Sequence, residues 1–414
     1  MADTVFLLGA GINRSARSWH DLVAPISGDF FRHALRHPRI SAQFMQDRLA
    51  PLFAFTRKFW RMDRDDLLEK DFDLEDCFTL VELERREAFA RGDQGRLEAA
   101  TYIQDLLTEL LLEYLGDLHY GIQDESAFGA FAAHIYDTKS VVLTLNYDTL
   151  LESQIENASP PNTSAIQTYM RRQEAESSAR SKLALELRQQ GASEEAIAAR
   201  MFQEEEVTDD DVAFTHHVWN PVLAYAARFD EVTLATPGIS KIVSGSRYYG
   251  HPRNAVDHAP FLKLHGSLGW FVRSGYFIDG RRLPDEMPSK TIVGRGFSVR
   301  RAPIIDHRSG EYLRPLLLTP QLLKPYHDLP LLDDVWRRAY HELSVCRRLV
   351  VGGYSFPSAD RHVRFLLRRA LAEREIEELC VVDPNEAVVQ TTKEVCHFRG
   401  RVQHFRDLES LMGT

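Results

Sequence analysis

Short apolar runs separated by long helical patterns dominate this sequence. Each of the six runs ends near a Gly, Asn, Asp or Pro residue, and most are apolar at every position. Strands of a parallel sheet that is covered by helices on both faces have this pattern. We therefore predict an α/β fold with a doubly wound parallel sheet. The six runs are Val5–Leu8, Val141–Leu145, Phe261–Leu264, Leu316–Leu318, Leu349–Val351 and Leu379–Val382.

Two blocks interrupt this alternation. Between the first two runs, Leu67–Arg91 and Leu97–Leu118 carry apolar residues at helical spacing, which predicts an inserted helical subdomain over residues 31–130. Residues 1–30 and 131–414 would then form the sheet domain. Within that domain, residues 165–212 are rich in charge and predict a helical hairpin that turns near Gly191. A solvated insertion and a partner contact both explain this hairpin.

Composition and charge limit the classes of function that we expect for this protein. The 414 residues are 44% hydrophobic and 27% charged, which is typical of a protein with a substantial core, and the formal net charge is −10. We do not expect direct nucleic-acid binding, because such proteins neutralise phosphates with Lys and Arg. The sequence contains neither a secretory signal pattern nor an apolar stretch long enough to span a bilayer, so we expect a cytoplasmic protein and no membrane contact.

The four cysteines argue against a zinc module. Cys77, Cys346, Cys380 and Cys396 are widely spaced, and none forms a C-x-x-C pair. We expect all four to be small buried hydrophobic residues in a reduced compartment, and we expect no metal site.

A glycine turn follows the first predicted strand. Gly9, Ala10 and Gly11 lead into polar residues that include Asn13. A turn of this kind lets backbone amides approach a pyrophosphate, as in Rossmann-like folds, although Arg14 stands where the dinucleotide fingerprint has its third glycine. A tight strand-to-helix turn without a ligand explains the glycines equally well.

Polar side chains also follow the second and third runs. Asn146 and Asp148 come after one strand, and His265 comes after the next. The carboxyl ends of strands line the ligand crevice in an open α/β sheet, and a histidine there can act as a general base. Asn146 is alternatively an Asx-turn residue, Asp148 a helix cap, and His265 one of 16 histidines with no chemical role.

The two last runs end in comparable turns. Gly353, Tyr354 and Ser355 follow the first of them, with Asp360 shortly after. Another strand ends in Asp383 and Asn385, which are placed to hydrogen-bond ribose or adenine.

Together these motifs resemble the sirtuin family, and more closely its bacterial sirtuin-like branch. The order of the motifs is similar across nearly the whole chain. Gly9-Ala10-Gly11 is similar to the phosphate turn, Asn146-Tyr147-Asp148 to the Asn-x-Asp motif, His265-Gly266 to the His-Gly motif, Gly353-Tyr354-Ser355 to Gly-Thr-Ser, and Asp383-Pro384-Asn385 to the late nucleoside-contacting segment.

The sequence departs from protein-deacylating sirtuins in two respects. It has no four-cysteine zinc module, and Asn13 stands where those enzymes have a serine. The bacterial branch typically contains NAD hydrolases of antiphage defence, some of which assemble with a HerA-type ATPase. The resemblance therefore implies an NAD glycohydrolase that uses NAD as its substrate, with a HerA-type ATPase or another defence protein as a possible partner. We also expect a homo-oligomer, because most soluble oligomers are closed and symmetric.

The resemblance also implies roles for the site residues. Asn146 would orient the ribose and the attacking water, His265 would be the general base, and Asp148 would support the site electrostatically. The remaining predicted residues would hold the cofactor. Two other functions stay open, an NAD-dependent protein deacylase and a non-catalytic sensor of NAD or ADP-ribose that gates a partner. The predicted cofactor residues are Gly9, Ala10, Gly11, Asn13, Gly353, Tyr354, Ser355, Asp383 and Asn385.

Overall fold

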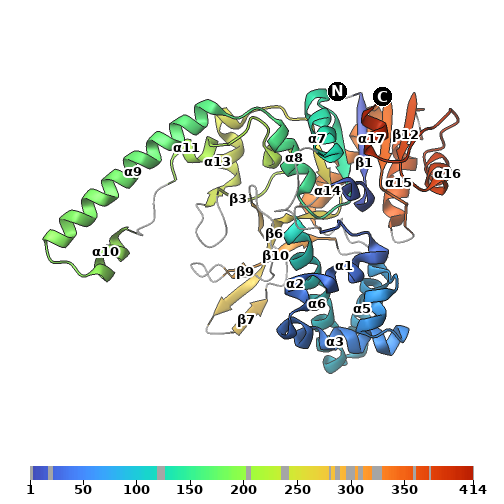
Figure 1. Cartoon of the computed structure of the whole chain (residues 1–414), viewed down its shortest axis with the longest axis horizontal. Coiled ribbons are helices and arrows are strands. Elements are labelled where there is room, and N and C mark those ends of the chain that lie inside the picture. The colour runs from blue at the N-terminus through green and yellow to red at the C-terminus, as the bar shows by residue number, and fades with distance from the viewer. Residues whose placement is uncertain are drawn as a thin grey trace.

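The computed structural model (Figure 1) has a parallel sheet, a helical block, a smaller second sheet and a projecting helical hairpin. It describes residues 3–16, 22–118, 126–201, 207–234, 242–278, 281–284, 290–294, 304–305, 311–318, 329–357, 360–372 and 374–413.

The parallel sheet has six strands in the order β13-β12-β11-β1-β2-β5, and all neighbours are parallel. Five of the six predicted apolar runs form its strands, so the predicted doubly wound α/β fold is confirmed. The strands are β1 (Thr4–Leu8), β2 (Val141–Thr144), β5 (Phe261–Lys263), β11 (Arg348–Gly352), β12 (Glu378–Val382) and β13 (Gln403–Phe405).

The strand order creates a switch point between β1 and β11. The chain runs outward from β1 through β2 to β5, returns to β11 on the other side of β1, and continues outward to β12 and β13. This is the order of a Rossmann fold, in which the ligand crevice lies at the carboxyl ends of the strands beside the switch point. The fold therefore predicts where a ligand binds before any side chain is considered.

Helices cover both faces of this sheet. One group contains α7 (Ala127–Thr138), α8 (Leu150–Ala158) and α17 (Leu408–Met412), which pack together. A second group contains α14 (Pro330–Val345), α15 (Arg361–Ala370) and α16 (Glu386–Val395). Right-handed crossovers that run in opposite directions from the switch point place the two groups on opposite faces. The strands between them are almost wholly buried, which explains their continuous apolar runs.

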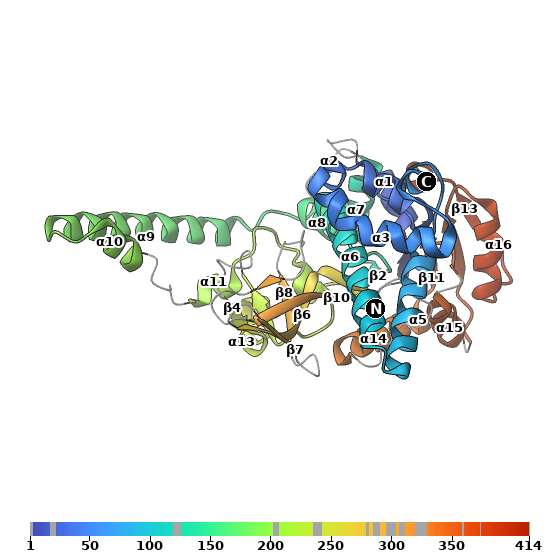
Figure 2. The same ribbon diagram turned by 90° about the horizontal axis from the view of Figure 1, so that it is seen from below.

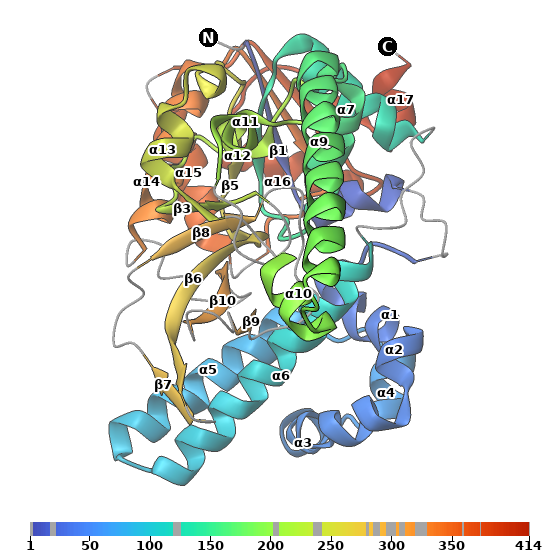
Figure 3. The same ribbon diagram turned by 90° about the vertical axis from the view of Figure 1, so that its left-hand side faces the viewer.

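A helical block lies between β1 and α7. Its long helices α5 and α6 lie side by side (Figure 3) and contribute Leu106, Leu107 and Leu110 to the core. The predicted helix over Leu67–Arg91 is divided in two, because the chain leaves helical geometry at Lys70. The elements are η1 (Ala10–Ser15), η2 (Ser27–Asp29), α1 (Phe30–Arg36), α2 (Pro38–Ser41), α3 (Gln43–Trp60), α4 (Arg64–Glu69), α5 (Leu74–Arg91) and α6 (Gln94–Leu118).

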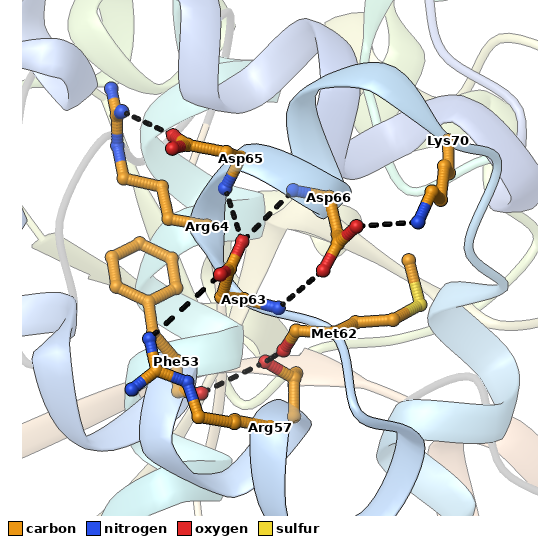
Figure 4. Close-up of polar contacts among 9 residues, drawn as sticks. Phe53, Arg57, Met62, Asp63, Arg64, Asp65, Asp66 and Lys70 are labelled. Atoms are coloured by element: carbon orange, nitrogen blue, oxygen red, sulfur yellow. Dashed lines mark hydrogen bonds and ion pairs between the residues drawn. The ribbon is translucent and has the colours of Figure 1, made fainter.

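A capping box starts α4 (Figure 4). The Asp63 carboxylate accepts from the amides of Asp65 and Asp66, and Asp66 accepts from the Asp63 amide at 3.1 Å. Asp66 also pairs with Lys70 at 2.5 Å, at the other end of the helix. These bonds satisfy amides that a helix start otherwise leaves unpaired, and so allow a six-residue helix at this corner.

The charged block forms a projecting hairpin. Helix α9 (Thr163–Gln189) extends away from the rest of the molecule, and the short α10 (Glu194–Met201) packs back on it (Figures 1 and 2). The turn contains Gly191 at φ +77°, close to the predicted position. Residues 202–206, which belong to the predicted insertion, lie outside the described part of the chain. Short elements lead back toward the sheet: α11 (Asp209–Ala213), α12 (Pro221–Ala224), α13 (Gly245–Gly250) and η3 (Pro252–Asn254).

A second, mainly antiparallel sheet was not predicted. The run Leu316–Leu318 was assigned to the parallel sheet, and this is wrong: it ends β10, which pairs antiparallel with β6. A three-residue apolar run shows burial but does not identify the sheet to which it belongs. The strands are β3 (Glu231–Thr233), β4 (Ile242–Ser244), β6 (Gly266–Ile278), β7 (Arg281–Pro284), β8 (Thr291–Gly294), β9 (Ile304–Ile305) and β10 (Glu311–Leu317).

Among the helices that the structure describes, none is long and apolar enough to cross a membrane.

Candidate functional site

A cavity of about 310 Å³ lies at the carboxyl ends of β1, β2, β5 and β11, beside the switch point. Its volume is in the range of small-molecule sites. Ten of the twelve predicted site residues line it, although they come from four separate parts of the sequence. They are Gly9, Ala10, Gly11, Asn13, Asn146, Asp148, His265, Gly353, Tyr354 and Ser355.

The glycine turn after β1 packs against the turn after β11. The Gly9 amide donates to the Gly352 carbonyl at 3.0 Å, and the Gly11 amide donates to the Gly353 carbonyl at 2.9 Å. A Cβ on Gly11 would lie 2.9 Å from Gly353, and one on Gly353, where φ is +58°, would lie 2.0 Å from the Ile12 amide. Packing between these loops therefore accounts for the glycines, and the amides of Gly9 and Gly11 already have backbone partners.

Two asparagines join the loops around the cavity. Asn146 donates from Nδ2 to the Gly9 carbonyl at 3.2 Å, which ties the loop after β2 to the loop after β1. Buried Asn13 donates from Nδ2 to Asp148 at 2.8 Å. The side-chain amide groups of Asn13 and Asn146 thus hold these two loops together at the switch point.

Asp148 is part of a buried polar cluster. Its carboxylate accepts from the Leu150 amide at 3.1 Å, at the start of α8, so it also has the helix-start role that sequence reasoning left open. Burial raises the pKa of Asp148, while the charge of Lys263 and the bonds from Leu150 and Asn13 oppose the rise. Lys263 is fully buried and pairs with Glu152 at 2.7 Å, and it also donates to the Asp148 backbone carbonyl.

His265 lies where the chain leaves the parallel sheet and enters the second sheet. Gly266 has φ +83°, and a Cβ there would lie 2.0 Å from the Leu316 carbonyl oxygen, so this corner requires glycine. The Leu318 amide donates to the His265 carbonyl at 2.8 Å. His265 is 4% exposed. Its imidazole lies beside the ring of Tyr147, with the two ring centroids 6.1 Å apart.

Asp360 lies next to His265 in the wall of the cavity. The Asp360 Oδ1 atom lies 3.6 Å from His265 Nε2, and both side chains are buried. The Tyr354 hydroxyl donates to Asp360 Oδ2 at 3.1 Å. Burial, followed by the nearby carboxylates of Asp360 and Glu75, raises the pKa of Tyr354 well above its ordinary value, so the phenol stays neutral. The sequence showed Asp360 near the Gly-Tyr-Ser turn but gave it no role.

The loop after β11 has an unusual conformation beside the cavity. Phe356 is buried and has φ +56°, which costs a non-glycine residue about 1–2 kcal/mol. Arg364 donates to its carbonyl at 2.6 Å, and the Tyr354 and Phe356 rings pack with centroids 4.6 Å apart. This loop leaves Ser355 exposed at the cavity wall.

The helical block supplies the facing wall, which sequence reasoning did not predict. Leu111, Leu115 and Leu118 of α6 line the cavity, as do Asp73 and Glu75 at the start of α5. Helical periodicity marked these leucines as buried residues, but it did not show that they face a ligand site rather than the core. The three leucines make part of this wall apolar, while polar side chains line the cavity at the strand ends.

Asp383 and Asn385 are not among the described residues that line the cavity. Asn385 accepts from the Ala387 amide at 3.0 Å and caps α16, and Asp383 accepts from the Asn385 amide at 2.8 Å. Their side chains make local turn contacts, and a role toward adenosine stays a prediction.

The cysteines are buried free thiols, as expected. Over the described ranges, no group of three or more His, Cys, Asp or Glu residues is arranged to hold a metal. A second cavity, of about 340 Å³, lies between α9, α11 and η3 and contains none of the predicted site residues. The chemistry-bearing residues therefore gather in the cavity at the switch point.

Comparisons with known proteins give weak likenesses. No family model matches the chain, and no curated protein matches it. A solved Sir2 homologue in complex with NAD is 13% identical with a TM-score of 0.34, over 99% of this chain and 86% of that chain. Two variants of a Sir2 homologue, each with ADP-ribose, are 12% identical with TM-scores of 0.30 and 0.29, over 95% of this chain and 90% of theirs. TM-scores of this size do not establish a shared fold.

Proposed function

We propose that this chain is an NAD glycohydrolase, which cleaves the bond between nicotinamide and ribose to give nicotinamide and ADP-ribose. The observation that carries the proposal is the cavity at the Rossmann switch point, where the Asn146-Tyr147-Asp148 and His265-Gly266 motifs meet the glycine turns. Ligands of open α/β sheets bind at this place. The sequence resemblance to sirtuins supports NAD as that ligand.

The charge of the cavity suits the reacting end of NAD. Its described lining contains the carboxyl groups of Asp73, Glu75, Asp148 and Asp360 and no lysine or arginine. NAD carries a cationic nicotinamide ring, and cleavage passes through an oxocarbenium-like state with positive charge on the ribose. Fixed negative groups in a buried site stabilise such charge.

The proposed reaction needs little proton transfer to the leaving group, because nicotinamide leaves as a neutral molecule. The electron pair of the C–N bond goes to nicotinamide, and a water molecule forms the new bond to the anomeric carbon. Asn146 would orient the ribose and this water, and His265 would take the proton from the water or from a ribose hydroxyl. A general base at this step accelerates a reaction by about 10²–10⁴-fold.

Product analysis tests the proposal. The purified chain is incubated with NAD, and nicotinamide and ADP-ribose are quantified with and without an acyl-lysine peptide. Equal amounts of both products, independent of peptide, are expected. Formation of O-acyl-ADP-ribose only with peptide would identify a deacylase instead, and tight NAD binding without products under either condition would identify a sensor.

A role in antiphage defence, a homo-oligomer and a HerA-type ATPase partner rest on the sequence resemblance alone. An enzyme that depletes NAD must be restrained in its own cell, so we propose that assembly controls it. Light scattering of the purified chain tests the homo-oligomer. NAD depletion in phage-infected cells, compared with uninfected cells, tests the defence role.

A further inference from the structure

His265 and Asp360 form a pair in which both side chains are buried. Their side chains are 6% and 4% exposed, and the His265 Nε2 and Asp360 Oδ1 atoms are 3.6 Å apart. They come from distant parts of the sequence, since His265 follows β5 and Asp360 precedes α15. A buried carboxylate close to an imidazole is costly to maintain and favours the ring nitrogen that faces it as the protonated one.

The carboxylate is held in place by its own partners. The Tyr354 hydroxyl donates to Asp360 Oδ2 at 3.1 Å, and the Asp360 amide donates to the Pro357 carbonyl at 3.1 Å. Phe356 packs on the Tyr354 ring and is itself in a left-handed conformation. Contacts with Tyr354 and Pro357 therefore hold Asp360 with its other carboxylate oxygen toward His265.

We propose that Asp360 is a positioning residue, which acts on the reaction through His265 and is itself supported by Tyr354. The Asp360 carboxylate favours the neutral tautomer that carries its proton on Nε2, so the basic lone pair is on Nδ1. In the step that rests on the proposed function, Nδ1 takes a proton from the attacking water while the C–N bond breaks toward nicotinamide. The resulting imidazolium is stabilised by the Asp360 carboxylate until its proton passes to solvent.

Several other titratable groups share the cavity with the His265 ring. They are Tyr147 and Asp148 after β2, Glu75 from α5 and Tyr354 after β11, while Lys263 in β5 is engaged by Glu152. Burial, then Asp360 and Glu75, raise the pKa of Tyr147, so this phenol remains neutral in the working range. The Asp360 carboxylate lies within 4 Å of His265 Nε2.

Kinetics of Asp360→Asn separate positioning from folding. The variant keeps the volume and the hydrogen bond to Tyr354 but lacks the charge. We expect kcat to fall about 10- to 100-fold with KM nearly unchanged, because the loss affects the base and its imidazolium. The acidic limb of the pH–rate profile should move to lower pH, because a neutral neighbour no longer favours the protonated ring. Asp360→Glu should restore part of kcat, whereas Asp211→Asn, a buried carboxylate remote from the cavity, should have no effect.

Histidine NMR provides a readout that does not depend on turnover. The side-chain ¹⁵N signals of His265, assigned by their loss in His265→Gln, should show the Nε2–H tautomer in the parent and a changed tautomer ratio in Asp360→Asn. Unchanged signals and an unchanged kcat in a folded Asp360→Asn variant would overturn the inference. If the parent chain does not cleave NAD at all, the proposed function fails, and the NMR comparison alone decides the role of Asp360.

Discussion

Replacing Lys263 by methionine should destabilise the fold far more than its small change in volume suggests. Lys263 is fully buried, and its ammonium group lies 2.7 Å from Glu152 and also donates to the Asp148 backbone carbonyl. With an effective dielectric constant near 20, the attraction at this distance is about 6 kcal/mol, and desolvation of the two ions offsets most of it. Truncating one partner leaves the other uncompensated, so we expect a loss of about 3–5 kcal/mol.

The loss should depend on pH in a defined direction. Burial raises the pKa of Glu152, and the neighbouring Lys263 charge opposes this, so removing Lys263 raises that pKa further. A carboxyl group whose pKa is higher in the folded state takes up protons there more readily than in the unfolded state. The loss of stability in Lys263→Met is therefore complete above the pKa of Glu152 in the folded variant. It becomes smaller as the pH falls toward the pKa of a glutamate in the unfolded chain, about 4.3.

Urea unfolding of a double-mutant cycle measures this effect. Glu152→Gln in the Lys263→Met background removes the stranded charge and keeps an acceptor for Tyr225, whose hydroxyl lies 3.4 Å from Glu152, so most of the stability should return. Lys70→Met is the surface control, because Lys70 pairs with Asp66 at 2.5 Å but is 63% exposed, and it should leave the transition unchanged. A loss of stability below about 1 kcal/mol for Lys263→Met at neutral pH would contradict this expectation.

Three further predictions concern the packing of a glycine, the reactivity of two buried cysteines and the start of a helix. Gly353→Ala should lower the free energy of unfolding by about 2–5 kcal/mol, because the backbone there is left-handed and the added Cβ would contact the neighbouring loop. Gly28 lines the same cavity with nothing within 4 Å of an added Cβ, so Gly28→Ala should be nearly neutral in urea unfolding. Burial raises the pKa of Cys77 and of Cys396 to about 12, so neither should react with a thiol reagent at pH 8 until the protein unfolds; rapid labelling of the folded chain would contradict this. Asp63→Ala removes the cap of α4 and should cost about 0.5–2 kcal/mol, read from the shift of the thermal transition.

The sequence predicted the parallel sheet because its strands are buried on both faces and so are apolar at every position. Most of the site residues that it predicted line the cavity, because polar residues directly after such strands share one edge of the sheet. The sequence explained Gly9 and Gly11 either by ligand approach or by a tight turn without a ligand, and the structure shows that both glycines contact the loop of Gly353. A motif identifies a small residue without identifying which neighbour requires it to be small.

The sequence did not predict the second sheet or the helical wall of the cavity. The pairing of β6 with β10 joins segments whose order in space depends on the corner at Gly266, and a single glycine in a sequence does not identify such a corner. Asp360 was visible after the Gly-Tyr-Ser turn, yet its significance comes from His265, almost a hundred residues earlier. Tertiary contacts of this kind leave no periodic signal.

The most direct test of the account is the rate of NAD cleavage by the parent chain, His265→Ala and His258→Ala. His258 is the control, because it is half-buried and precedes strand β5, which His265 follows, but it lines the second cavity. We expect His265→Ala to lose about 10²–10⁴-fold in kcat while His258→Ala retains the parental rate. Parental turnover by a folded His265→Ala variant would contradict the assignment of this cavity as the catalytic site.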